Sequence, residues 1–463
     1  MKAKKIIYTL CLSGLLATTS CDYLDVIPKG KSLIETTDQY LGLIEELYPD
    51  YGSENTGYIA PEMIFYMAND VLNYKYPVSS ANFMADESYD RARYITQDAA
   101  YSGCYSRIAK YNILIEGMPS ATGPDADKVM GIAQAKFMRA YNYFFLVNVF
   151  AKAYDPQTAS SDRGIIIHKV FNMENILGQS TVQEVYDFIL QDINDAIDNL
   201  PVKTRSAVVP GKAAGYAFKA KVHLYLQQYD QAMEAAKKSL ELGNDLVDMV
   251  DFYRRDASGF AMLPLDNEEC LLHLRGFNQF DPNMTHVIKE VADLYVKGDT
   301  RKLLWFRQTP HPQVEAGSIC FNTYNRIQYN VSGMRLSEVY LILAECYARQ
   351  DNYTEAMKWI NELRAKRILP EDYVPLTASS RKEAMDIVIT ERRIELVLTP
   401  NTLSDLKRLN IQDEYRKTIT KKITDKKTGE VHSFILNPES HIYILPFPVD
   451  AMETNSKLIQ NSK

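Results

Sequence analysis

The chain has 463 residues, of which 46% are hydrophobic and 24% are charged, as expected of a globular protein with a large core. Its 52 basic and 59 acidic side chains give a formal net charge of −7 and form no basic stripe, which argues against a nucleic-acid partner. No apolar stretch after residue 21 approaches the length of about eighteen residues that a membrane-spanning helix needs. Composition therefore excludes several classes of protein but selects no activity.

The first twenty residues have the pattern of an export signal. Three lysines within residues 2–5 form a basic start, and residues 6–17 form an apolar run that is too short to span a bilayer. Small residues then lead to Cys21, the position at which a bacterial lipoprotein signal needs a cysteine that receives lipid. We therefore predict a signal peptide over residues 1–20 and lipidation of Cys21. An ordinary secretory signal with an incidental cysteine is the alternative, because Thr18 stands where a branched apolar residue is more usual.

Helical periodicity dominates the rest of the chain. Apolar and aromatic residues recur at helical spacing over residues 90–118 and again over 132–150. A capping-box pattern over residues 180–183 predicts the start of a further helix, which Pro201 ends, and another helix follows over 213–226. The sequence therefore predicts a mainly α-helical fold.

Two of these helical stretches repeat one pattern. Ala220 precedes a tyrosine, a polar turn and then Tyr229 in a Tyr-x-x-Ala-Met segment, and Ala344 precedes the same pattern at Tyr353, 124 residues later. Small residues that let helices approach closely are typical of tetratricopeptide repeats. We interpret the two stretches as degenerate repeats rather than unrelated hairpins. Their separation argues against adjacent copies in one regular array.

Two long stretches interrupt the helical pattern. Residues 51–88 carry many aromatic residues among Asn, Ser, Pro and Gly, and residues 244–332 mix short apolar runs with Asp, Asn, Gly and Pro. Short extended segments follow at 419–447. Segments of this length inside a compact protein are usually functional loops. We therefore predict one domain over residues 21–463, with a helical scaffold, long irregular loops and a few short strands.

The sequence carries no strong motif for catalysis or metal binding. Its seven histidines are scattered without metal-ligand spacing, and it has neither a phosphate-binding glycine loop nor a GxSxG elbow. Glu268-Glu269 leaves a glycosidase pair open, but adjacent acids usually form a solvated face. The charge cluster over 391–395 suits an ion-pair network on a helix. A disulfide between Cys270 and Cys320 is open but has little support.

Six short motifs stand in order along the chain. They are Cys-Asp-Tyr-Leu-Asp-Val-Ile-Pro at 21–28, Ala-Lys-Phe-Met-Arg-Ala-Tyr-Asn-Tyr-Phe at 135–144, Gly-Asp-Thr-Arg-Lys at 298–302, Arg-Leu-Ser-Glu-Val-Tyr-Leu-Ile-Leu-Ala-Glu at 335–345, Glu-Arg-Arg-Ile-Glu-Leu at 391–396, and Pro-Phe-Pro at 446–448 with Asn455, Leu458, Gln460 and Asn461. Each motif alone is modest, but six in this order are specific. Together they resemble the SusD/RagB family of Bacteroidetes outer-membrane lipoproteins, nearly end to end.

One stretch departs from the pattern of that family. Members usually have a Gly-x-Arg-aromatic stretch before Asp-Leu-x-Arg, whereas residues 399–404 here read Thr-Pro-Asn-Thr-Leu-Ser before Asp-Leu-Lys-Arg at 405–408. The difference affects the expected geometry of this loop rather than the family resemblance.

The resemblance implies a protein that captures nutrients and is not an enzyme. A tetratricopeptide scaffold would pack on a SusC-like TonB-dependent barrel transporter, and a lipid anchor would hold the protein at the outer membrane, facing the cell exterior. The ligand would be an oligosaccharide, or a peptide as in the RagB branch, with no cofactor or metal. The candidate ligand contacts, chosen as rings and polar groups in the loops, are Asp70, Tyr74, Tyr76, Asn82, Phe83 and Phe280.

Two other classes of function stay open. An α-helical glycoside hydrolase would need a close pair of carboxylates in a deep cleft. An adaptor would bind its transporter and no small ligand.

Overall fold

The computed structural model describes most of the chain after residue 33, namely residues 34–46, 59, 63–65, 68–172, 174–255, 268–274, 285–307, 317–321, 333–397 and 399–462. Cys21, the signal peptide and Phe280 lie outside the described residues, so the predictions that concern them stay predictions. The described part is mostly helical with a few short strands, as predicted.

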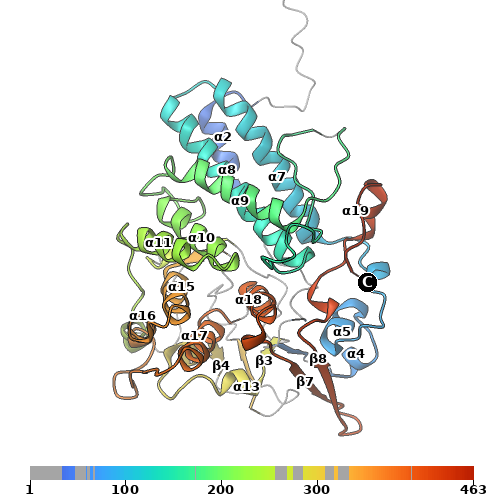
Figure 1. Cartoon of the computed structure of the whole chain (residues 1–463), viewed down its shortest axis with the longest axis vertical. Helices are drawn as coiled ribbons and strands as arrows, with labels where there is room; N and C mark the ends of the chain where they lie inside the picture. The colour runs from blue at the N-terminus through green and yellow to red at the C-terminus, as the bar shows by residue number, and fades with distance from the viewer. Residues whose placement is uncertain are drawn as a thin grey trace, which may run out of the picture.

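The long helices form one continuous series (Figure 1). They are α7 (Ala99–Gly117), α8 (Asp125–Phe150), α9 (Val182–Ile197), α10 (Lys212–Tyr225), α11 (Tyr229–Leu240), α15 (Leu336–Arg349), α16 (Tyr353–Ala365), α17 (Arg381–Glu395) and α18 (Asn401–Asn410). Each helix from α7 to α11 packs on the next, α11 packs on α15, and α15 packs on α16 and α17. Helix α2 (Thr37–Glu46) packs on α8.

The two predicted repeats are the hairpins α10–α11 and α15–α16. Gln227 and Asp351, 124 residues apart, take left-handed φ values of 59° and 61° in the two interhelical turns. The next residue in each turn donates its backbone N–H to an equivalent carbonyl, that of His223 at 2.9 Å and that of Tyr347 at 3.0 Å. The expectation that the copies are not adjacent is wrong for their positions in space, because α11 of the first hairpin packs on α15 of the second.

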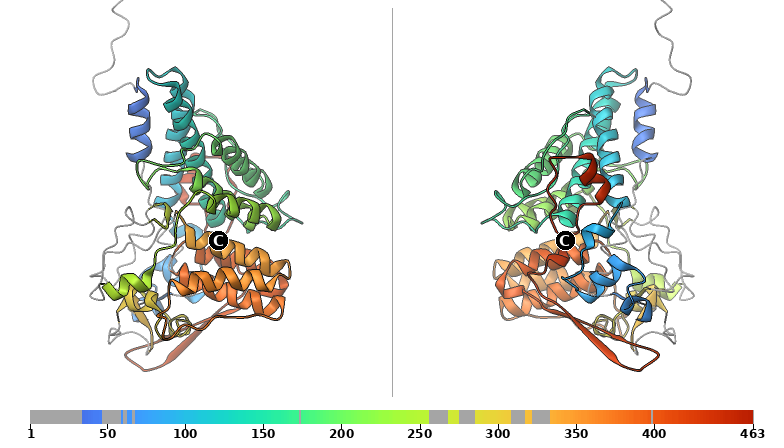
Figure 2. Two further views of the ribbon diagram at one scale, coloured as in Figure 1. Left: turned by 90° about the vertical axis from the view of Figure 1, so that its left-hand side faces the viewer. Right: turned by 90° about the vertical axis from the view of Figure 1, so that its right-hand side faces the viewer.

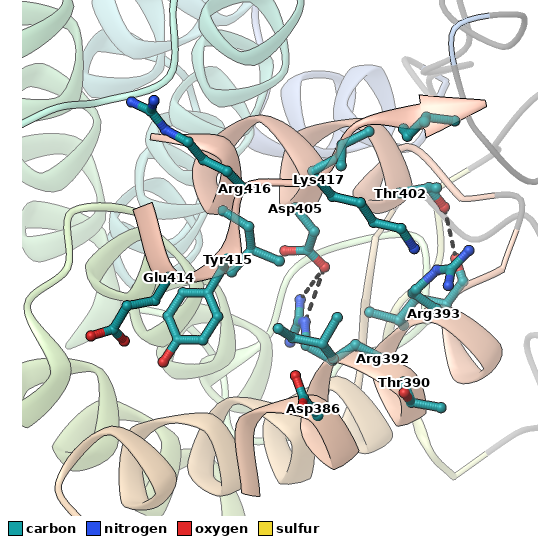
Figure 3. A pocket seen from close by; sticks show the side chains of 15 residues that line it. Asp386, Thr390, Arg392, Arg393, Thr402, Asp405, Glu414, Tyr415, Arg416 and Lys417 are labelled. Carbon is teal, nitrogen blue, oxygen red and sulfur yellow. Dashed lines mark hydrogen bonds and ion pairs between the residues drawn. The ribbon is translucent and has the colours of Figure 1, made fainter. Parts of the chain in front are cut away.

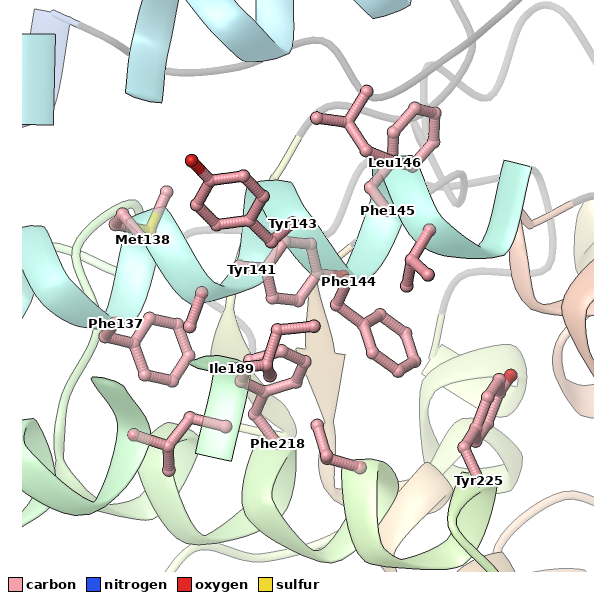
Figure 4. Close-up of a cluster of buried hydrophobic side chains, with 14 of the residues drawn as sticks. Phe137, Met138, Tyr141, Tyr143, Phe144, Phe145, Leu146, Ile189, Phe218 and Tyr225 are labelled. Carbon is pink, nitrogen blue, oxygen red and sulfur yellow. The ribbon is translucent and has the colours of Figure 1, made fainter. Parts of the chain in front are cut away.

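Aromatic rings fill the core between α8 and α10 (Figure 4). Phe144 packs edge-on against Phe218 and Tyr225, with ring centroids 5.4 and 5.0 Å apart. Phe137 and Tyr141 lie 5.3 and 4.9 Å from the same Phe218 ring. Tyr141 and Tyr225 therefore serve helix packing together with the phenylalanines.

Two helix boundaries differ from the sequence-based expectation. The stretch 90–118 is not one helix but α6 (Arg91–Tyr94) and α7, because Asp98 caps α7 by accepting from the backbone N–H of Tyr101 at 2.8 Å. The capping box of α9 uses Thr181 with Glu184, one residue later than predicted.

The strands connect the two loop regions. A four-stranded antiparallel sheet has the order β1-β3-β5-β4, in which β1 (Met63–Phe65) comes from the first region and β3 (Thr285–Val287), β5 (Ile319–Phe321) and β4 (Phe306–Arg307) come from the second. This sheet, α12 (Met249–Arg255) and α13 (Lys289–Ala292) lie beside one end of α15–α17 (Figure 2), where Ile394 of α17 shares a buried apolar cluster with Met249 and Val287. Helix α14 (Thr300–Trp305) leads directly into β4.

Two further strand pairs complete the described sheets. Strand β2 (Cys270–Leu272) pairs with β6 (Met334–Arg335), and β7 (Ile419–Thr424) forms a hairpin with β8 (Val431–Leu436). Cys270 is a free buried thiol, and Cys320 lies in β5 of another sheet, so the open disulfide is not formed.

Candidate ligand-binding site

Three tyrosines stack in a row at the edge of the first loop region. Tyr74 and Tyr89 lie with ring centroids 5.1 Å apart at 21°, and Tyr89 and Tyr94 lie 5.1 Å apart at 27°. They come from the turn after α4 (Ala68–Leu72), the turn after α5 (Pro77–Met84) and the end of α6. Tyr94 is 49% exposed, so the outer end of this tyrosine row is accessible to solvent.

Hydrogen bonds fix the inner end of the tyrosine row. Tyr74 has a φ of 54°, which is rare for a bulky residue and is typical of a functional constraint. Its hydroxyl donates to the Asp86 carboxylate, which also accepts from Ser88 through the backbone N–H at 3.0 Å and the hydroxyl at 2.6 Å. Partial burial alone would raise the pKa of Asp86, but these hydrogen bonds lower it. Burial and the neighbouring carboxylate raise the pKa of Tyr74, so the phenol keeps its proton.

Charged side chains border the exposed rings. Arg93 places its guanidinium 5.9 Å from the ring centre of Tyr94. In the turn between α4 and α5, the Lys75 amine lies 5.5 Å from the ring centre of Tyr76 and 2.7 Å from the Asp70 carboxylate. Tyr76 is 40% exposed. The structure therefore brings Asp70, Tyr74 and Tyr76, which the sequence analysis selected, to one turn at the surface.

Asn82 and Phe83 do not reach this surface. Phe83 is fully buried with Val71 and Ile423, and its ring meets that of Phe434 on β8 edge-on at 6.4 Å. Asn82 is also fully buried and accepts from Arg91 at 3.0 Å. Both were selected as ligand contacts because the sequence does not distinguish the inner face of so short a helix. Asn82 and Phe83 therefore belong to the buried packing beneath this surface.

Arg91, which the sequence analysis missed, anchors α6 and with it Tyr94. Its guanidinium donates to Asn82, to the carbonyls of His441, Ile442 and Ile444 and to the Ser462 hydroxyl, at 2.9–3.2 Å. Burial lowers the pKa of Arg91 to about 10, so it stays charged at neutral pH. Nothing in the local sequence signals this role, since the three carbonyls that Arg91 bonds lie about 350 residues away.

Behind the loops lies a buried ion-pair network around α17. Arg301 donates to Asp299, Glu391 and Glu395 at 2.6–3.0 Å, and Arg367 donates to Glu395 at 3.2 Å and Glu269 at 2.8 Å. The structural role predicted for the 391–395 cluster is confirmed, but Glu391 and Glu395 pair with Arg301, Arg364 and Arg367 on other elements. The expectation of a solvated pair at 268–269 is wrong for Glu269, which is buried in this network.

A cavity of about 380 Å³ lies between α17, α18 and the turn η3 (Asp413–Tyr415) (Figure 3). It adjoins the loop in which the sequence departs from its family pattern. At its base the Asp405 carboxylate accepts from Arg392 at 2.8 and 3.0 Å and from Arg408 at 2.7 Å. Burial opposes ionisation, but the two guanidiniums lower the pKa of Asp405, so this carboxylate is held as an anion and is unsuited to donate a proton.

Within the described residues, no group of three or more His, Cys, Asp or Glu side chains is arranged to hold a metal ion. No helix among them is long and apolar enough to cross a membrane.

The first part of the chain, residues 22–224, matches a family model described as starch-binding and associating with the outer membrane, and residues 313–463 match the model of the SusD family. A SusD-like protein, P38 of Formosa agariphila, is 23% identical over 368 residues, which cover 66% of this chain and 71% of the relative.

Solved structures have the same fold. A SusD superfamily protein from Bacteroides thetaiotaomicron superposes with a TM-score of 0.72 at 18% identity, covering 92% of this chain and all of that one. A SusD-like carbohydrate binding protein from Bacteroides vulgatus superposes with a TM-score of 0.64 at 18% identity, covering 92% and 94% of the two chains. Since the two family models together span most of the sequence, the chain belongs to the SusD/RagB family.

Proposed function

We propose that this protein is a lipid-anchored, non-catalytic lipoprotein at the cell surface, which binds an oligosaccharide and delivers it to a SusC-like TonB-dependent transporter. The observation that carries the binding claim is the tyrosine row, whose outer ring is open to solvent. The starch-binding description of the matching family model supports the same ligand class.

The geometry of the row suits a sugar. One face of a pyranose ring is lined by C–H groups, and these pack favourably against the electron-rich face of an exposed aromatic ring. The hydroxyl groups at the rim of the same sugar need donors and acceptors, which Arg93, Lys75 and Asp70 can supply. Affinity then comes from stacking and hydrogen bonds, without a reacting group.

A peptide ligand is the second candidate. The cations Arg93 and Lys75 lie over tyrosine rings at the edge of the site, and such a surface also suits the acidic side chains or the carboxyl terminus of a peptide. Salt dependence separates the two ligand classes, because ion pairs weaken with ionic strength and sugar stacking does not.

Calorimetry on the chain without residues 1–21 tests the proposal against a panel of neutral oligosaccharides and short peptides. We expect an oligosaccharide to bind. We expect Tyr94→Ala to raise the Kd of that oligosaccharide by about tenfold or more, because one aromatic stacking contact is lost. Tyr216→Ala is the matched control, since Tyr216 is a partly exposed tyrosine on α10 that also lies beside a cation, Lys238 at 5.8 Å. Equal affinity in wild type and Tyr94→Ala would contradict the role of the row, and no binding across the panel would favour an adaptor.

A further inference from the structure

The lining of a second cavity includes none of the three tyrosines of the row. Its volume is about 260 Å³, and it is formed by α7, the segment 166–172 and α19 (Val449–Thr454). Cavities of about 150 Å³ already accept a benzene ring, so this one has room for a six-membered ring with substituents.

The lining of this cavity carries no Asp, Glu, Lys or Arg side chain. The cavities beside α17 and beside Lys152 are different, because each is bordered by both acidic and basic groups. An ionic ligand would find no counter-charge among these lining side chains, and its desolvation would not be compensated by them. The lining therefore selects a neutral ligand.

Both aromatic rings and amide groups line the cavity. Tyr105 meets the His168 imidazole edge-on at 5.8 Å, and Phe171, which is 41% exposed, lies at the cavity with them. The amides of Asn112 and Asn455 and the Thr454 hydroxyl also line it. Apolar ring faces combined with uncharged hydrogen-bonding groups match the two kinds of surface that a sugar presents.

His168 offers the most direct polar contact. Its ring nitrogens make no hydrogen bond with any other residue that the structure describes. Its backbone N–H donates to the Tyr143 hydroxyl oxygen at 2.8 Å, and its carbonyl accepts from Asn112 at 2.9 Å. Burial lowers the pKa of His168, so the imidazole is neutral at pH 7 and offers one donor and one acceptor. A sugar hydroxyl is itself a donor and an acceptor, so it can hydrogen-bond to either nitrogen of this neutral imidazole.

The walls of the cavity are held in place from outside. Asn455 donates to the carbonyl of Leu177 at 2.9 Å, and Lys457 donates to that of Ile176 at 2.8 Å. Phe171 donates its backbone N–H to the Glu116 carboxylate at 2.8 Å. These hydrogen bonds tie the segment that carries Phe171 to α7 and to the chain after α19.

We infer that this cavity is a second subsite that binds one residue of a neutral sugar, with Phe171 as the stacking ring and His168 as the hydroxyl partner. The inference rests on the proposed function but uses different residues. Contacts between α6 and α19, such as the backbone N–H of Val449 donating to the carbonyl of Ile95 at 2.9 Å, separate it from the tyrosine row.

Proton–carbon NMR on the chain without residues 1–21 can follow the imidazole signals of the seven histidines. The signal of His168 reports on this subsite. The probes are maltotriose, cellotriose, mannotriose and xylotriose, with trigalacturonate as the charged comparison, and His168→Gln assigns the signal. We expect at least one neutral trisaccharide to shift the His168 signal saturably and trigalacturonate to leave it unmoved. Phe171→Ala changes an exposed side chain and should raise the Kd obtained from the His168 shift by about tenfold.

The outcomes separate the two claims. A His168 signal that no neutral trisaccharide moves, or one that moves equally in Phe171→Ala, overturns this subsite, while a calorimetric loss in Tyr94→Ala would still support the tyrosine row. A His168 shift that persists in Tyr94→Ala supports the subsite independently of the row.

Discussion

Lys407 joins two helices that lie far apart in the sequence. From α18 its buried amine donates to the carbonyls of Asn148 at 2.5 Å and Ala151 at 2.7 Å, at the C-terminal end of α8. These carbonyls have no partner within the helix, and the negative end of the helix dipole favours a cation there. Burial acts in the opposite direction and lowers the pKa of Lys407 to about 7. The residue therefore contributes through its hydrogen bonds.

Replacing Lys407 by methionine should lower the free energy of unfolding by about 1–3 kcal/mol, because two buried carbonyls lose their donor while the apolar stem is kept. Urea unfolding at pH 7 measures the loss. Lys422→Met, at an exposed position on β7, is the control and should stay within about 0.5 kcal/mol of wild type. Equal stability of the two variants would contradict the capping role.

At the scale of elements, buried charges hold α17 against the second loop region. Glu395 on α17 faces Arg301 on α14 and Arg367 just after α16, at 2.9 and 3.2 Å. Gly298, whose φ of 72° favours glycine, starts the turn that brings Arg301 inward. Burial alone would raise the pKa of Glu395, but the surrounding guanidiniums lower it to about 2.

Because of this network, the free energy of unfolding depends on pH in the acidic range. The folded pKa of Glu395 lies below its usual value of 4.5, so its contribution is complete above pH 4.5 and is lost as the pH falls toward 2. Glu395→Gln should be less stable than wild type by about 3–5 kcal/mol at pH 7, because buried guanidiniums lose a counter-charge. The difference should narrow between pH 4.5 and 2 in chemical unfolding. A difference that stays constant over that range would show that Glu395 does not titrate with folding.

At the scale of the whole molecule, local patterns predicted the scaffold, while the surface site depended on distant contacts. Helical spacing found α8, and the repeated Tyr-x-x-Ala pattern found both hairpins, because each is determined by neighbours within a few turns. The stacking of α11 on α15 could not be predicted, since it depends on where the intervening chain returns.

The candidate site was predicted only in part for the same reason. Tyr74 and Tyr76 were found from loop composition, but Tyr89 and Tyr94 join them only because Arg91 ties α6 to carbonyls near the C-terminus. Phe83 has the same composition signal as its exposed neighbours and is buried by the β7–β8 hairpin, which lies more than 300 residues away.

A crystal structure of the chain without residues 1–21, in complex with the oligosaccharide that binds most tightly in calorimetry, tests the central claim most directly. We expect a sugar ring stacked on Tyr94 at van der Waals distance, about 4 Å, with its hydroxyl groups hydrogen-bonded to side chains beside the row. A well-ordered oligosaccharide bound only elsewhere, for example in the cavity beside α17, with the tyrosine row uncovered, would contradict it.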